Sequence, residues 1–82
     1  MTNTERYAAR VDAHLQEFAT DALRREFLQR EEDRWIRRYE LFQRKVLTNQ
    51  PITDEDGSAW DYVETLAEIT ARLAPLREVA NA

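Results

Sequence analysis

Residues 26–46 read EFLQREEDRWIRRYELFQRKV. Apolar side chains recur in this stretch at intervals of seven, four, three and four residues. Side chains with this spacing share one face of an α-helix. Neither glycine nor proline occurs here, nor anywhere between residues 5 and 47. The sequence therefore predicts a long amphipathic helix around this segment. The apolar stripe of that helix consists of Leu28, Trp35, Tyr39, Phe42 and Val46.

A second apolar stripe precedes the first. Its steps of four, three and four residues are again helical, and Thr2-Asn3-Thr4-Glu5 fits a capping box that would start a helix. Because no helix breaker follows, we favour one continuous helix over residues ~4–47, which would be about 65 Å long. The alternative is a break near Thr20-Asp21, where the threonine could cap a new helix. The stripe consists of Val11, Leu15, Phe18 and Ala22.

The end of the chain predicts a second, shorter helix. Residues 48–58 contain Pro51, Gly57 and three acidic residues, which indicates an acidic loop. A helix over residues ~59–74 follows, with an apolar seam of helical spacing. Pro75 should end or kink this helix, leaving residues 75–82 as a tail. The seam consists of Tyr62, Leu66, Ile69 and Leu73.

These elements predict an all-α fold in a single small domain, residues 1–82. A long helix and a shorter antiparallel helix would form a hairpin, and the short helix can cover only about half of the long one. The uncovered stripe (Val11, Leu15, Phe18 and Ala22) would then be the binding surface for a second copy, giving a homodimeric, coiled-coil-like bundle. If the chain instead breaks near Thr20, it forms a three-helix bundle and the stripe is core. We expect the hairpin core to contain Leu28, Trp35, Tyr39, Phe42, Val46, Trp60, Tyr62, Val63, Leu66, Ile69 and Leu73.

The basic residues of the first helix have acidic neighbours in sequence. Residues 24–45 hold eight basic and five acidic side chains, whereas residues 53–68 hold six acids and no base. An acid four residues before a base favours an ion pair on a helix, and this spacing predicts that much of the basic stripe is neutralised. Phosphate binding needs an uncompensated basic patch, so we do not favour nucleic acid as the partner. The predicted pairs are Asp21–Arg25, Glu26–Arg30, Asp33–Arg37 and Glu40–Arg44.

Four basic residues have no acid at that position. They are the residues expected to contact an acidic partner protein or, in the alternative, nucleic acid: Arg24, Arg34, Arg38 and Lys45.

Motifs for catalysis or metal binding are weak. The chain has no cysteine and one glycine, which excludes zinc–thiolate sites and glycine-rich phosphate loops. His14 and Glu17 form H-x-x-E, the reverse of the E-x-x-H pairs in di-metal helical bundles. Asp54 and Asp56 resemble part of a calcium loop, but Thr65 stands where that loop needs glutamate. We expect no catalytic residues, no metal and no cofactor.

The remaining signals bear on location and function. No apolar run approaches the ~18 residues needed to span a bilayer, and the N-terminus lacks an apolar signal core. We therefore expect a cytoplasmic protein with no membrane contact. The function that fits is a small non-catalytic interaction protein, such as an adaptor, an inhibitor or an antitoxin-like regulator, which binds itself and another protein. The alternatives are a nucleic-acid-binding regulator that uses the arginine-rich helix face and a metal-dependent helical-bundle protein.

Overall fold

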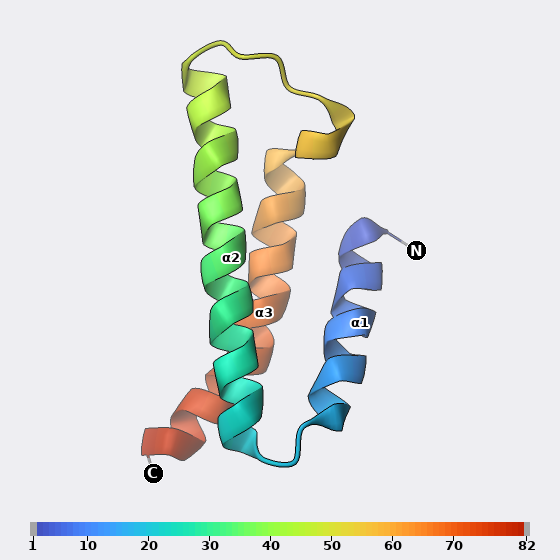
Figure 1. Ribbon diagram of the computed structural model, residues 1–82, viewed down its shortest axis with the longest axis vertical. Coiled ribbons are helices and arrows are strands. Elements are labelled where there is room, and N and C mark those ends of the chain that lie inside the picture. The colour runs from blue at the N-terminus through green and yellow to red at the C-terminus, as the bar shows by residue number, and fades with distance from the viewer. Residues whose placement is uncertain (1, 82) are drawn as a thin grey trace.

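The computed structural model of the chain describes residues 2–81, and for Glu55 and residues 78–81 it describes the backbone only. It contains three α-helices: α1 (Asn3–Glu17), α2 (Asp21–Leu47) and α3 (Ala59–Asn81) (Figure 1). A short 3-10 turn, η1 (Asp54–Asp56), lies in the loop before α3. Since residues 2–81 contain no strand, the predicted all-α class is confirmed.

The prediction of one continuous helix over residues ~4–47 is wrong, because the chain turns at residues 18–20. Phe18 is extended (φ −83°, ψ 136°) and closes α1, and Thr20 is extended (φ −135°, ψ 156°) and opens α2. The Thr20 hydroxyl accepts a hydrogen bond from the Leu23 N–H at 3.2 Å, which satisfies one of the free amides at the start of a helix. The break therefore occurs at a capping residue, without glycine or proline.

All three helices contribute to one apolar core. Val11 of α1, Leu28 of α2, and Ile69 and Leu73 of α3 are buried together. The turn at Thr20 makes this possible, because it folds α1 back so that its apolar face is covered by the same chain. Partly buried side chains surround this core: Tyr7, Leu15, Phe27, Trp35 and Leu76.

The N-terminal stripe is consequently not a free surface. Val11 is 4% exposed and lies in the core. Leu15 is half-buried against that core, and the half-buried Phe18 ring lies 5.4 Å from the ring of Phe27. Only Ala22, just inside α2, is exposed. The expectation of an uncovered stripe is wrong for Val11, Leu15 and Phe18, because the turn at residues 18–20 folds α1 back and the same chain covers them.

The rest of the core lies where α2 and α3 run side by side. The buried Tyr62 packs its ring 5.3 Å from Phe42 and 5.5 Å from Tyr39, and 5.9 Å from Trp35. Most of the core residues expected from the sequence are buried or half-buried here. Three are instead exposed: Val46 by 51%, Trp60 by 67% and Val63 by 46%.

Helix geometry explains two of these exceptions. Trp60 precedes Tyr62 by two residues, so the two side chains point about 200° apart around α3. Val63 follows Tyr62 by one residue and points about 100° away. Neither side chain can face α2 and α1 when Tyr62 does. Both therefore lie on the outside of α3.

The last helix is longer than the sequence predicted. Instead of a tail from residue 75, α3 continues through Pro75 to Asn81. Proline has no N–H to bond the carbonyl four residues earlier, and its ring crowds that carbonyl, which bends a helix without ending it. The C-terminal turns of α3 lie at an angle to the rest of the helix (Figure 1).

Candidate functional site

Arginines from two helices meet over an aromatic side chain on the α1/α2 side of the protein. Arg10 of α1 and Arg34 and Arg38 of α2 line a hollow of about 350 Å³, together with the ring of Trp35. The Arg38 guanidinium carbon lies 4.3 Å from the centre of the Trp35 ring, in cation–π contact. We call these four residues the basic groove.

The helices place these side chains by simple spacing. Arg34 and Arg38 are four residues apart, so they lie one above the other on α2. On α1, Arg10 follows Tyr7 by three residues and shares its side of the helix. The Tyr7 ring packs edge-on against Trp35 at 5.2 Å, which holds α1 against α2. Arg10 is thereby brought to the arginines of α2.

A hydrogen bond joins the two helices beneath the groove. The Tyr7 hydroxyl donates to Oε2 of Glu31, which is half-buried. Burial and this bond to a carboxylate raise the pKa of the Tyr7 phenol well above its ordinary value, so that Tyr7 stays neutral. Glu31 also lies 3.6 Å from Nη1 of Arg34. This carboxylate therefore has two partners and does not reach the other arginines as an ion pair.

The indole of Trp35 retains an unused donor. Among the described residues, no acceptor forms a hydrogen bond with its buried Nε1–H. The indole is near enough to Tyr7 to oppose, without reversing, the rise in the pKa of that phenol. An indole N–H can only donate, and this one is buried beside the Tyr7 phenol.

The groove carries uncompensated positive charge. In the described part of the chain, Arg10 and Arg38 have no carboxylate within ion-pair distance, and both residues are exposed. Arg34 has the single longer contact to Glu31 and keeps 62% of its side chain exposed. Guanidinium groups in this state are ready to bind carboxylate or phosphate oxygens.

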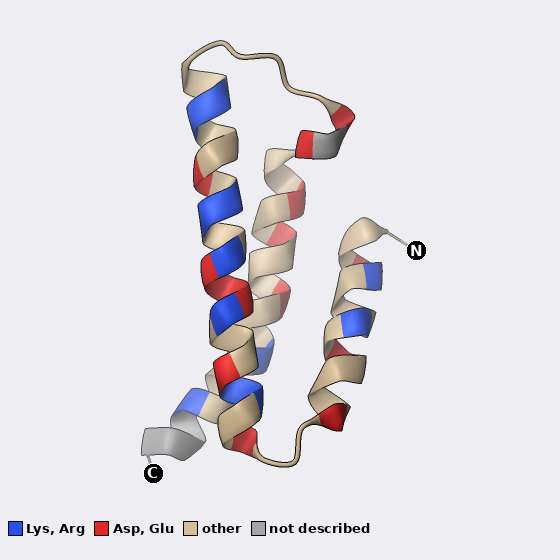
Figure 2. Cartoon of the chain, viewed as in Figure 1, with Lys and Arg blue, Asp and Glu red and all other residues tan. Residues whose placement is uncertain are grey.

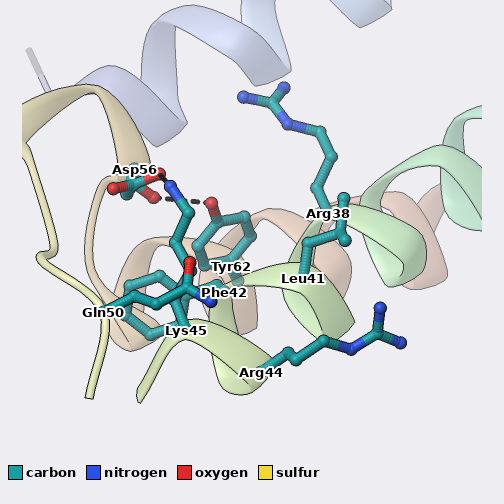
Figure 3. Close-up of a pocket in the computed structure, with 8 residues that line it drawn as sticks. All are labelled: Arg38, Leu41, Phe42, Arg44, Lys45, Gln50, Asp56 and Tyr62. Carbon is teal, nitrogen blue, oxygen red and sulfur yellow. Dashed lines mark hydrogen bonds and ion pairs between the residues drawn. The ribbon is translucent and has the colours of Figure 1, made fainter. Parts of the chain in front are cut away.

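A second hollow of about 300 Å³ lies on the other side of Arg38, near the loop before α3 (Figure 3). Lys45 Nζ meets Asp56 Oδ1 at 2.6 Å, and this contact is the first cause of the lowered pKa of the Asp56 carboxyl. Tyr62 donates to the Asp56 carbonyl at 2.5 Å. Figure 3 shows Lys45 reaching towards Asp56, whereas Arg44 extends away from it and Arg38 reaches towards α1. Lys45 therefore holds the loop against α2. Arg38 has no ion pair among the described residues and lines both hollows.

The four contact residues expected from the sequence differ in their surroundings in the structure. Arg34 and Arg38 lie in the basic groove. Arg24 is used inside the chain, because it donates to the carbonyl oxygens of Leu15 and Phe18 at the end of α1. Lys45 is used by Asp56. The sequence did not point to Arg10, since its position beside Arg38 depends on the turn at Thr20.

The predicted neutralisation of α2 is only partly present. Glu26 and Arg30 form the expected pair. Asp21 instead pairs with Arg24, at 2.8 Å. For Arg25, Arg37 and Arg44, the described residues provide no ion pair at all. Figure 2 shows basic and acidic residues alternating along α2, and the acids of α3 on its side towards α1. Because several expected pairs are not formed, α2 keeps more unpaired basic side chains than the sequence indicated.

The metal hypothesis gains no support from the arrangement of the ligands. His14 Nδ1 and Glu17 Oε2 are 3.8 Å apart, but both side chains are more than half exposed. The His14 ring packs 5.7 Å from that of Phe27. Within the described residues, no three side chains of histidine, cysteine, aspartate or glutamate come together as a metal site would require.

Comparison with protein-family models, with curated proteins and with solved structures gave no match. Function therefore has to be inferred from the residues of the chain itself. Of the helices in the described part of the chain, none combines the length and the apolar character that crossing a membrane requires.

Proposed function

We propose that this protein is a small non-catalytic interaction protein that binds an acidic segment of another protein in the basic groove. One observation carries the proposal. Arg10 and Arg38 come from different helices, line the same hollow, and lack a carboxylate partner among the described residues. A carboxylate side chain that entered the hollow would meet donors from two helices at once.

The chemistry of the groove favours carboxylates on a protein. The planar guanidinium can hold a carboxylate through two parallel hydrogen bonds. Arginine and tryptophan are also the side chains most enriched where protein partners bind tightly. The hollow of about 350 Å³ has room for one or two side chains of a partner. An adaptor, an inhibitor or a regulator would use such a surface.

Nucleic acid is the second candidate, and one observation favours it. The ion pairs expected for Arg37 and Arg44 are not formed, so basic side chains continue along α2 beyond the groove. Against it, Asp54, Asp56 and Asp61 line a hollow that shares Arg10 and Arg38. These acids repel any anion, and the repulsion grows with the number of anionic groups held near them. A phosphate backbone would therefore be opposed more strongly than a single carboxylate side chain in the hollow.

Titration calorimetry with poly-glutamate and with a single-stranded oligonucleotide tests the proposal. We expect poly-glutamate to bind the wild type, and Arg10→Gln and Arg38→Gln each to weaken binding about two- to five-fold, as for an exposed charge pair. The matched control is Arg25→Gln. It removes the same charge from the side of α2 that faces α3 and should leave binding unchanged.

Two results would contradict the proposal. Equal affinities of Arg38→Gln and Arg25→Gln for poly-glutamate would mean that binding depends on the net charge of the protein and not on the basic groove. Binding of the oligonucleotide without binding of poly-glutamate would favour the second candidate, and its affinity should then fall steeply with salt. Circular dichroism of each variant verifies that the helices are intact.

A further inference from the structure

The outer side of α3 carries a row of uncharged, exposed residues. They recur in steps of three, four, three and four, the spacing of a helix–helix seam. Trp60 is 67% exposed and Val63 is 46% exposed, and the smaller members are exposed as well. We call this row the outer seam of α3; it consists of Trp60, Val63, Ala67, Thr70 and Ala74.

Besides its buried side, α3 has a second side without charged residues. Its inner side holds Tyr62, Ile69 and Leu73, which are buried against the other helices. One flank of α3 faces α1, and there Arg72 bonds Asp12 at 2.6 Å. Another charged residue, Arg77, lies towards α2, where it bonds Glu32 at 3.1 Å. A helix that is apolar on both sides is typically covered on both sides. The single chain covers only the inner one.

The surface extends from α3 onto α2. Glu32 of α2 lies against α3, since its carboxylate accepts from Arg77 at 3.1 Å. Ile36 is four residues further along the same side of α2 and is 39% exposed. An apolar side chain of α2 therefore adjoins the outer seam, on the side of the protein away from the basic groove.

The chain as a whole exposes more surface than a compact monomer of its mass. A compact monomer of 9.7 kDa exposes about 5,100 Å² by the usual scaling with mass. This elongated chain, with extents of 45 × 28 × 15 Å, exposes 6021 Å². The excess of about 900 Å², taken over the whole chain, is of the order of the ~800 Å² that each partner buries in a stable interface.

We propose that the outer seam of α3 binds a second copy of this chain in antiparallel orientation, with the two-fold axis at Ala67. The seam has a large side chain at one end, that of Trp60, and a small one at the other end, that of Ala74. An antiparallel pair sets the Trp60 of each copy against the Ala74 of the other, so that large side chains meet small ones. A parallel pair would stack two tryptophans and leave the alanine end poorly filled.

The proposal is independent of ligand binding in the basic groove, because the two surfaces use different residues and different sides of α2. It also assigns self-association to residues other than those that the sequence suggested. Val11, Leu15 and Phe18 are covered by their own chain, whereas Trp60 and Val63 are not.

Light scattering over a concentration series tests the association. The wild type should show twice the chain mass of 9.7 kDa. Ala67→Glu should lower that mass two-fold, because two carboxylates would meet on the axis. Ala67 is exposed in the single chain, so its substitution leaves the fold intact. The matched control is Ala13→Glu on α1, which is equally exposed and should remain dimeric. A monomeric wild type, or a dimeric Ala67→Glu, would overturn the proposal.

Oxidation of single cysteine variants tests the orientation, which is possible because the chain has no cysteine. Ala67→Cys should cross-link with itself on the two-fold axis. Ala74→Cys should not, since it lies about 10 Å along the helix from Ala67 and so about 20 Å from its symmetry mate. A disulfide needs Cα atoms within about 7 Å of each other. Cross-linking of both variants would show a parallel pair and overturn the antiparallel assignment.

Discussion

The Arg24 side chain at the start of α2 donates a hydrogen bond from Nε to the Leu15 carbonyl oxygen of α1, at 2.8 Å. The same guanidinium donates to the Phe18 carbonyl at 2.6 Å and to the Asp21 carboxylate at 2.8 Å. The last carbonyls of a helix have no partner within that helix. Arg24 satisfies two of them from the next helix and so fixes the turn between α1 and α2.

Replacing Arg24 should therefore loosen the packing of α1. We expect Arg24→Ala to lower the free energy of unfolding by about 1.5–3 kcal/mol, the range for hydrogen bonds to a charged group. Urea unfolding followed by circular dichroism measures this change. Arg25→Ala is the matched control, since the described residues give Arg25 no ion pair, and it should cost much less. Equal losses in both variants would contradict the role given to Arg24.

The turn shows what the sequence could and could not predict. Apolar spacing correctly predicted helical structure in α1, α2 and α3, because that spacing depends only on the sequence itself. The break at Thr20 was the less favoured alternative, because its signal is one capping hydroxyl within a run of good helix formers. Tertiary contacts decide whether the helix breaks at Thr20. The hydrogen bonds of Arg24 and the burial of Val11 exist only after α1 has folded back. At Pro75 the predicted kink is present, but the predicted tail from residue 75 is wrong, since a proline can bend a helix without ending it.

The core makes a direct prediction about stability. Leu28 is 0% exposed and touches side chains from α1 and α3. Leu28→Ala should lower the free energy of unfolding by about 2–5 kcal/mol, because it removes buried methyl groups and leaves a cavity. Leu41→Ala, on the same helix and 55% exposed, is the control and should have little effect. Urea titration of both variants makes the comparison. A small loss for Leu28→Ala would mean that α1 does not pack on α2 and α3.

The basic groove could be predicted only in part. Arg34 and Arg38 were identified because no acid precedes them by four residues. Trp35 was expected to be core, and it is partly buried beneath Arg38. Arg10 was missed because it lies on another helix, and its nearness to Arg38 depends on the turn at Thr20. The i, i+4 rule also overestimated ion pairing, since exposed pairs are worth only a few tenths of a kcal/mol and other contacts easily replace them.

The Tyr7–Glu31 hydrogen bond predicts a dependence of stability on high pH. The pKa of Tyr7 is raised in the folded protein, mainly by burial, so the neutral phenol is favoured by folding. Its contribution to stability should be complete below the unfolded pKa of about 10 and should decline as the pH rises above that value. We expect wild type to lose stability relative to Tyr7→Phe as the pH rises from about 10 to about 12. Urea unfolding at several pH values measures the difference, and parallel curves for the two proteins would refute it.

The ion pair between Asp12 and Arg72 predicts the opposite behaviour in acid. The hydrogen bonds from Arg72, at 2.6 and 3.0 Å, lower the pKa of the Asp12 carboxyl in the folded protein. The stability from this pair should therefore be present above the unfolded pKa of about 3.9 and be lost as the pH falls below it. About half of the Asp12 side chain is exposed, so we expect less than about 1 kcal/mol, and less still at high salt.

Asp12→Asn tests this pair directly. It keeps the shape of the side chain and removes its charge, so it should be less stable than wild type at neutral pH and equally stable near pH 2. Asp33→Asn on α2 is the matched control, because Asp33 is exposed, lies far from either end of its helix, and has no ion pair among the described residues. Thermal unfolding of the three proteins between pH 2 and pH 7 provides the measurement. If wild type and Asp12→Asn lost stability in parallel on acidification, Arg72 would not be holding α3 to α1 through Asp12.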